Sequence, residues 1–171
     1  PYPKENEINH AETHIKNIVS NFLPSVLNYL NVNFENTNQI VAGASMGGLM
    51  SIKTSILFPQ FRNIISLSPA FWFGYPRVLF DVKNLSNESS TYLYTGKKEG
   101  HIFGDHVKNI FSSDWDLDFS NNDDFYYSGV KKIEDSLKSN NKTVIFSYQE
   151  NGHHNETSWA TAILDILGKL I

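Results

Sequence analysis

The chain has 171 residues, 40% of them hydrophobic, which suits one domain with a buried core. Its formal net charge of -4 argues against a nucleic acid as the main partner, because phosphate binding needs clustered lysine and arginine. It contains no cysteine, which excludes disulfides, thiolate catalysis and cysteine-ligated zinc.

The sequence shows no membrane-spanning pattern. No apolar run approaches the roughly 20 residues that a transmembrane helix needs. The N-terminal stretch PYPKENEINH lacks the apolar centre of a signal peptide. We therefore expect no membrane span, and the sequence leaves the compartment open while favouring the cytoplasm.

The first third of the chain predicts a helix, a strand and a second helix. Apolar residues recur at helical spacing from Ile8 to Leu30, and Pro24 inside this run predicts a kink or two shorter helices. A polar turn, NFENTN at 33–38, leads to a short buried strand at 40–42. The pattern SMGGLMSIKTSILF then predicts a helix that ends at Pro59.

The rest of the chain alternates strands and helices. We expect strands at 64–68, 91–96 and 142–149, the second of them ended by Gly96. We expect helices at 101–112, 126–137 and 158–171, and an exposed acidic loop at 112–124. This alternation predicts a single α/β domain over residues 1–171, with a mostly parallel sheet flanked by helices.

The motif that carries chemistry is Gly43-Ala44-Ser45-Met46-Gly47, a G-x-S-x-G pattern between a strand and a helix. A serine on such a turn projects its hydroxyl above the sheet, in a backbone that tolerates no bulk two residues to either side. The first N–H groups of the following helix, that of Met46 among them, point at a developing oxyanion. We therefore expect Ser45 to be a nucleophile and Met46 to contribute to an oxyanion hole.

A serine nucleophile needs a base and an acid. In hydrolases built around this motif the base follows late in the chain, and His153 and His154 lie between the last predicted strand and helix. The acid is expected after the third strand, where Glu99 follows Gly96. Asp105 is the alternative acid.

Four segments in this order, GASMGG, FPQFRNIISLSPAFWF, YTGKKEG and GHHNETSW, resemble the esterase-D-like family of the α/β-hydrolase fold. That family includes siderophore esterases, feruloyl esterases and S-formylglutathione hydrolases. The resemblance covers residues from about Ile40 to the C-terminus. It implies an α/β-hydrolase that acts on a small-molecule ester and needs no cofactor.

The resemblance assigns roles residue by residue. It matches Ser45 to the nucleophile, Met46 to the oxyanion hole and Glu99 to the acid. The family's H-x-x-x-x-W spacing aligns His154 with Trp159 and so favours His154 over His153 as the base. The S-P-A-x-W element places Trp72, with Phe71 beside it, at the substrate pocket, and His153 is expected there too.

One departure concerns the start of the fold. Only 44 residues precede Ser45, fewer than in members of this family, and no counterpart of the earlier strands is visible. We expect a removed segment or a second chain to complete this part and to supply the second oxyanion donor.

The sequence thus predicts a serine carboxylesterase with a Ser45–His154–Glu99 triad and an acyl-enzyme intermediate. The alternatives are an acyltransferase of the same fold and a non-catalytic binding module derived from an esterase. No metal is expected, since the acidic loop around Asp114, Asp116 and Asp118 lacks the glycine and the closing glutamate of a calcium-binding loop.

Overall fold

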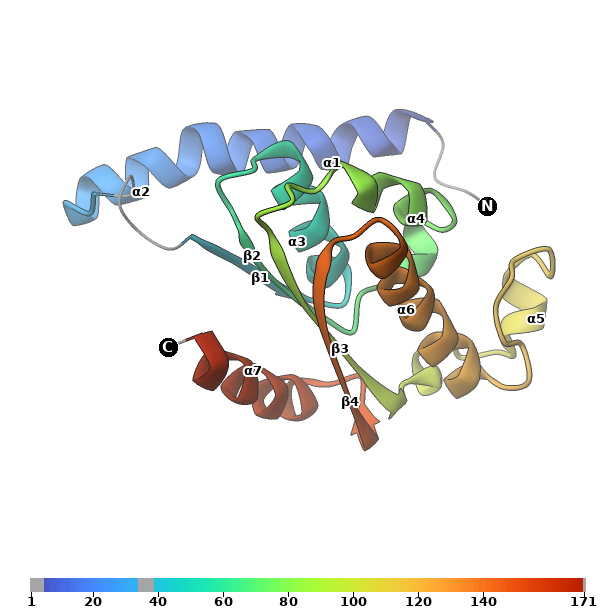
Figure 1. The fold of residues 1–171 in the computed structure, drawn as a ribbon. Helices are drawn as coiled ribbons and strands as arrows, with labels where there is room; N and C mark the ends of the chain where they lie inside the picture. Colours follow the sequence, from blue (N-terminus) through green and yellow to red (C-terminus); the bar gives the residue numbers. More distant parts are fainter. Residues whose placement is uncertain (1–4, 34–38, 171) are drawn as a thin grey trace. The chain divides into compact units, whose positions relative to one another are not determined.

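The computed structural model describes residues 5–33 and 39–170. They fall into two compact units, one up to Gln39 and one from Ile40 onward, and each is described by itself (Figure 1). The polar turn expected at 33–38 lies, apart from Asn33, outside the described residues. The prediction of a single domain over 1–171 stays a prediction.

The first unit is helical and is interrupted where the sequence predicts it. Helix α1 (Glu5–Asn17) continues into a π-helical turn (Ile18–Phe22) and then into α2 (Leu23–Leu30), which carries Pro24 in its first turn. Proline has no N–H to donate, and its ring crowds the carbonyl of the preceding turn. The wider π turn directly before Pro24 accommodates this mismatch, so the expected interruption is confirmed.

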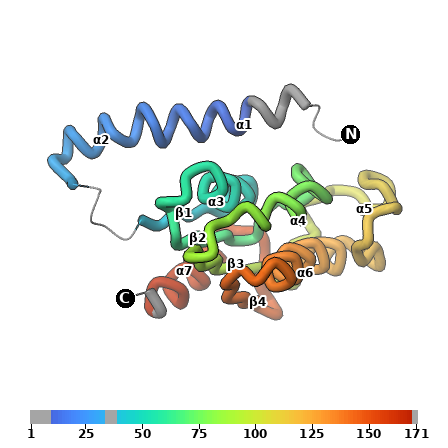
Figure 2. Tube along the Cα trace, turned by 45° about the horizontal axis from the view of Figure 1, so that its top comes forward, coloured from blue at the N-terminus to red at the C-terminus, as the bar shows by residue number. Residues whose placement is uncertain are grey.

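The second unit alternates strands with helices, as predicted. Figure 2 follows this path along the chain. Its elements are β1 (Ile40–Ala44), α3 (Met46–Leu57), β2 (Asn63–Leu67), a 3-10 turn (Phe71–Phe73), α4 (Arg77–Asp81), a 3-10 turn (Val82–Asn84), β3 (Ser90–Lys98), a 3-10 turn (Gly100–Phe103), α5 (Val107–Ile110), α6 (Asn122–Ser139), β4 (Thr143–His153) and α7 (Glu156–Leu170).

The four strands form one fully parallel sheet in the order β1-β2-β3-β4. Parallel strands need long crossovers, and helices supply them here between each strand and the next. Because all strands run the same way, their carboxyl ends meet at one edge of the sheet. The loops that follow β1, β2, β3 and β4 therefore gather at that edge.

Each face of the sheet has its own apolar core. On one face, Ile64 and Leu93 pack with Ile52 of α3 and with α6 side chains such as Ile133. On the other face, residues of β2 and β3 pack against α7, with Ile166 among them. Figure 1 shows α7 on the side of the sheet opposite α3 and α6. The predicted parallel sheet flanked by helices is confirmed.

Several predicted element bounds were wrong. Strands β1 and β4 extend to Ala44 and His153, and α6 begins at Asn122, inside the stretch expected as an acidic loop. Strand β3 does not end at Gly96 but continues to Lys98, because Gly96 lets the backbone of Gly152 in β4 approach closely. The helix expected at 101–112 is instead a 3-10 turn and the short α5. Gly104, at φ 70°, ends the first, and His106 caps the second through its Nδ1.

Among the residues that the structure describes, none of the helices has the length and apolar character required to cross a bilayer.

Candidate active site

Ser45 occupies a strained turn between β1 and α3, with φ 56° and ψ -120°. A residue other than glycine rarely adopts a positive φ, so the surrounding structure must hold it there. Its N–H donates to the carbonyl of Leu67, and its own carbonyl accepts from the N–H groups of Gly48, Leu49 and Ala70. These four hydrogen bonds tie the turn to the end of β2 and to the first turn of α3.

The glycines around Ser45 are not equally constrained. A Cβ atom at Gly43 would lie 2.3 Å from the carbonyl oxygen of Gly47, and one at Gly48 would lie 2.8 Å from that of Leu67. Among the described atoms outside its own helical turn, a Cβ at Gly47 would meet nothing within 4 Å. The expectation that the turn excludes bulk on both sides of Ser45 therefore holds at Gly43 and is wrong at Gly47, where α3 faces open space.

His154 lies directly after β4 and reaches both Ser45 and Glu99. Its Nε2 is 2.9 Å from Ser45 Oγ, and its Nδ1 is 2.9 Å from Glu99 Oε2. An ionised carboxylate only accepts hydrogen bonds, so Nδ1 carries the proton. Nε2 is then free to accept the proton of the Ser45 hydroxyl, which is the arrangement that activates a serine.

The Glu99 side chain is fully buried and makes three hydrogen bonds. Its Oε1 accepts from the Ser68 hydroxyl at 2.7 Å and from the Gly96 N–H at 2.5 Å, while Oε2 faces His154. Burying a carboxylate is costly unless it is paired and hydrogen-bonded. The three partners meet this requirement and leave the carboxylate one orientation, toward the imidazole.

Ser68 was not singled out from the sequence as a functional residue. It is fully buried, has φ 43°, and accepts a hydrogen bond from Trp159 Nε1 at 2.9 Å while donating to Glu99. The Tyr126 hydroxyl donates to the Ser68 carbonyl at 2.6 Å. The signal for this network was present in the serine of S-P-A-x-W and the tryptophan of H-x-x-x-x-W, but their pairing across 91 positions depends on the fold.

Two tyrosines near Glu99 remain protonated. Burial, together with the nearby Glu99 charge, raises the pKa of Tyr94 to about 12. The same two causes, in the same order, raise the pKa of Tyr126 well above its usual range. The hydroxyl groups of both tyrosines are therefore neutral beside the Glu99 charge.

Met46, the expected oxyanion residue, begins α3 directly after Ser45. Its N–H belongs to the first turn of the helix, where N–H groups have no acceptor within the helix. Its side chain is 40% exposed. The Met46 N–H thus lies at the positive end of the α3 dipole, in the residue that follows Ser45.

Trp72 and Phe71 form an aromatic layer close to His154. The Trp72 ring contacts the ring of Tyr126, which lies 5.4 Å from the imidazole of His154. Phe71 is fully buried and packs edge-on against Trp72. The structure gives Phe71 a packing role behind Trp72, and the predicted substrate contact of either residue stays a prediction.

His153 and Asp105 lie apart from the Ser45–His154–Glu99 chain of hydrogen bonds. His153 is exposed, its N–H donates to Ser158 Oγ, and its ring stands 5.8 Å from that of His101. Asp105 is also exposed and accepts from the His106 N–H and the Asn109 amide. The structure therefore brings His154 and Glu99 to Ser45, and it does not bring His153 or Asp105 there.

In the part of the chain that the structure describes, no three His, Asp or Glu side chains lie together in a group that could hold a metal ion. In the acidic loop, Asp116 pairs with Lys132, and Asp118 accepts from the Ser120 N–H. These carboxylates are engaged within the chain.

Comparison with known proteins finds similarity in structure. No family model matches the chain. No curated protein matches it in sequence either. Solved structures do match. A ferulic acid esterase superposes with a TM-score of 0.62 at 13% identity, over 89% of this chain and 58% of that protein. The fold is that of the α/β-hydrolases.

Two further matches support this fold. The siderophore hydrolase EstA from Aspergillus nidulans has a TM-score of 0.65 at 14% identity, over 91% of this chain and 57% of that protein. The enterobactin esterase FES from Shigella flexneri has a TM-score of 0.60 at 17% identity, over 90% of this chain and 37% of that protein. The chain thus spans between about a third and three fifths of the α/β-hydrolases that it matches.

Proposed function

We propose that this chain acts as a serine carboxylesterase on small-molecule esters, with Ser45, His154 and Glu99 as its catalytic triad. The observation that carries the proposal is the continuous hydrogen-bond chain from Ser45 Oγ through His154 to the buried Glu99, with Ser45 held on a strained turn. The fold likeness to structures named as esterases favours a hydrolase.

Acylation begins with attack of Ser45 Oγ on the ester carbonyl carbon, while His154 Nε2 takes the hydroxyl proton. The carbonyl oxygen becomes an oxyanion, which the Met46 N–H stabilises at the start of α3. His154, now an imidazolium paired with Glu99, gives the proton to the leaving alkoxide oxygen. The alcohol departs and leaves an ester of Ser45.

Deacylation repeats these steps with water. His154 Nε2 takes a proton from a water molecule, whose oxygen attacks the acyl carbon. The tetrahedral intermediate collapses, His154 returns the proton to Ser45 Oγ, and the carboxylic acid leaves. Glu99 keeps the imidazole in one tautomer and one orientation through both halves of the reaction. Trp72, backed by Phe71, forms a wall of the substrate pocket in this proposal.

The test is covalent labelling with a fluorophosphonate, followed by intact-mass analysis. The native chain is expected to gain one adduct, Ser45→Ala to gain none, and His154→Ala to react at least a hundredfold more slowly. Glu99→Gln keeps the shape of the acid but loses its charge, and is expected to slow labelling strongly as well.

An exposed serine elsewhere serves as the matched control. Ser25 lies in α2, and Ser25→Ala is expected to label like the native chain. A native chain that is folded by circular dichroism yet gains no adduct, or an adduct that persists in Ser45→Ala, would overturn the proposal. If the native chain labels at Ser45, it is then assayed for hydrolysis of a panel of esters.

A further inference from the structure

Trp159 of α7 contacts both the proposed base and the residue that orients the proposed acid. Its ring lies 4.9 Å from the His154 imidazole, centroid to centroid, and its Nε1 donates to Ser68 Oγ at 2.9 Å. The ring also packs against the apolar core between the sheet and α7. Trp159 takes no part in the proton transfers proposed above, yet its side chain touches the base and, through Ser68, reaches the acid.

The hydrogen bond from Trp159 fixes the direction of the next hydrogen bond. An indole N–H can only donate, so the Ser68 oxygen is the acceptor. The single proton of the Ser68 hydroxyl then remains for Glu99 Oε1, 2.7 Å away. Hydrogen bonds in such a chain polarise one another, so the first bond strengthens the second. This Trp159–Ser68–Glu99 relay ends on the carboxylate that faces His154.

The backbone of Ser68 is held independently of Trp159. Its N–H donates to the carbonyl of Tyr94 at 2.7 Å, and its carbonyl accepts from the Tyr126 hydroxyl at 2.6 Å. Loss of the Trp159 N–H therefore leaves the Ser68 backbone in place and releases only its side chain to rotate. The effect of the indole N–H on Glu99 can thus be measured separately from the fold of this loop.

Trp159 and His154 belong to one hydrogen-bonded turn between β4 and α7. The His153 N–H donates to Ser158 Oγ at 3.0 Å, and the Ser158 N–H donates to Asn155 Oδ1 at 3.0 Å. The backbone N–H of Trp159 donates to the Asn155 carbonyl at 3.2 Å. Because these bonds fix the turn, the indole ring keeps its place beside the imidazole.

We propose that Trp159 is a positioning residue for the ester cleavage, and that through Ser68 it directs the Glu99 carboxylate toward His154. The relay is a feature of the fold, whereas its effect on catalysis rests on the function proposed above. Glu99 must stay aligned with the imidazole while His154 passes a proton from Ser45 to the leaving alcohol. Residues that lock the orientation of such a group act on the rate of the reaction more than on substrate binding.

The first test is Trp159→Phe, which keeps an aromatic ring in the core but loses the indole N–H. With 4-nitrophenyl acetate as substrate, kcat is expected to fall about fivefold, the effect of one hydrogen bond, while KM changes little. The rate of fluorophosphonate labelling is expected to fall by the same factor. A native rate in Trp159→Phe would overturn the proposal.

A double-mutant cycle shows whether Trp159 acts through Ser68. In Ser68→Ala the relay is already broken, so the addition of Trp159→Phe is expected to change the labelling rate by less than about twofold. The same fivefold loss in both backgrounds would overturn the relay, because Trp159 would then act through its ring alone.

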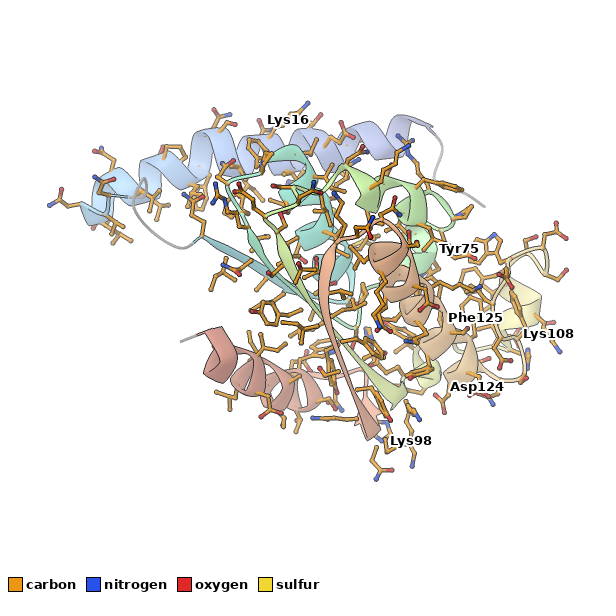
Figure 3. The ribbon with its side chains drawn as sticks, viewed as in Figure 1. Lys16, Tyr75, Lys98, Lys108, Asp124 and Phe125 are labelled. Atoms are coloured by element: carbon orange, nitrogen blue, oxygen red, sulfur yellow. The ribbon has the colours of Figure 1, made fainter. Side chains whose placement is uncertain are left out.

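Trp115 provides the matched control. It packs against Tyr75 and Phe125, with ring centroids 4.8 Å and 6.4 Å from its own. Figure 3 labels both of these residues near α6, which covers the face of the sheet opposite α7. Trp115→Phe makes the same chemical change and is expected to label at the native rate. Equal losses in Trp115→Phe and Trp159→Phe would overturn the positioning role.

A measurement without turnover separates this inference from the proposed function. The Nδ1 proton of His154, which faces Glu99, is followed by NMR in Ser45→Ala and is assigned by its loss in His154→Ala. Trp159→Phe is expected to shift this signal upfield, as a weaker hydrogen bond does, and Trp115→Phe to leave it unchanged. A chain that hydrolyses no ester but shows the upfield shift rejects the esterase and keeps the relay. A chain that hydrolyses the ester with equal kcat with and without Trp159→Phe, and shows no shift, does the reverse.

Discussion

The Ser68 hydroxyl donates to Glu99 Oε1 across 2.7 Å, although the two residues are 31 positions apart. Ser68 directly follows β2 and Glu99 directly follows β3, so neighbouring parallel strands deliver them to the same edge. Trp159 of α7 completes the arrangement by donating to the Ser68 oxygen. The carboxylate that faces His154 is thus oriented by residues from three separate segments.

Removal of the Ser68 hydroxyl is expected to slow catalysis more than it weakens binding. A hydrogen bond to a charged group is worth about 1.5–3 kcal/mol, so Ser68→Ala is expected to lower kcat and the fluorophosphonate labelling rate roughly tenfold or more. KM is expected to change little. Ser68→Gly loses the same hydroxyl but relaxes the positive φ, so it should match Ser68→Ala in rate. A full rate in either variant, with only the melting temperature changed, would limit Ser68 to packing.

Relief of the backbone strain at Ser45 is expected to stabilise the fold while abolishing labelling. Ser45→Gly and Ser45→Ala both lose the hydrogen bond to His154, but only glycine adopts φ 56° without strain. We expect the free energy of unfolding of Ser45→Gly to exceed that of Ser45→Ala by about 1 kcal/mol. Urea denaturation of the two variants measures the difference. A more stable Ser45→Ala would mean that the turn stores no strain.

The two glycines of the G-x-S-x-G motif are expected to differ sharply in their tolerance of alanine. Gly43→Ala drives a methyl group into the Gly47 carbonyl and is expected to cost about 3 kcal/mol or more of stability. Gly47→Ala meets open space in the first turn of α3, where alanine is the better helix former, and is expected to be neutral or mildly stabilising. Thermal denaturation of the two variants measures the difference in stability. Equal losses of stability would contradict the close contact at Gly43 and the open space at Gly47.

The pKa of Tyr94 predicts a specific loss of stability in alkali. The unfolded chain releases this proton near pH 10, whereas the folded chain keeps it up to about pH 12. Between these values the folded state binds more protons, so the free energy of unfolding falls as pH rises. A shift of this size corresponds to at most about 2–3 kcal/mol.

Tyr94→Phe is expected to remove this contribution. Urea denaturation at pH 9 and at pH 11 should show a smaller decline for Tyr94→Phe than for the native chain. Tyr29, an exposed residue of α2, provides the control, because Tyr29→Phe should decline as the native chain does. The same decline in Tyr94→Phe as in the native chain would contradict the prediction.

Local patterns in the sequence were sufficient for the four strands, the longer helices and the position of Ser45, but not for α4 or the short turns. Apolar runs of strand length, separated by helical periodicity, predict a parallel α/β sheet because each pattern must bury a face. The G-x-S-x-G motif between a strand and a helix located the turn for the same local reason. Pro24 likewise predicted the interruption before α2, since proline acts on its own turn of helix.

The partners of Ser45 depended on strand register, which the sequence left open between His153 and His154. Neighbouring residues of a strand point to opposite faces, so a shift by one residue would exchange the two imidazoles. His153 is the last residue of β4 and pairs with Lys98, whereas His154 follows it and reaches Ser45, and the exposed His153 ring lies beside that of His101. The positive φ of Ser68, its contact with Trp159 and the open space beside Gly47 also arise only when distant segments meet, because no local pattern encodes a contact across 91 residues.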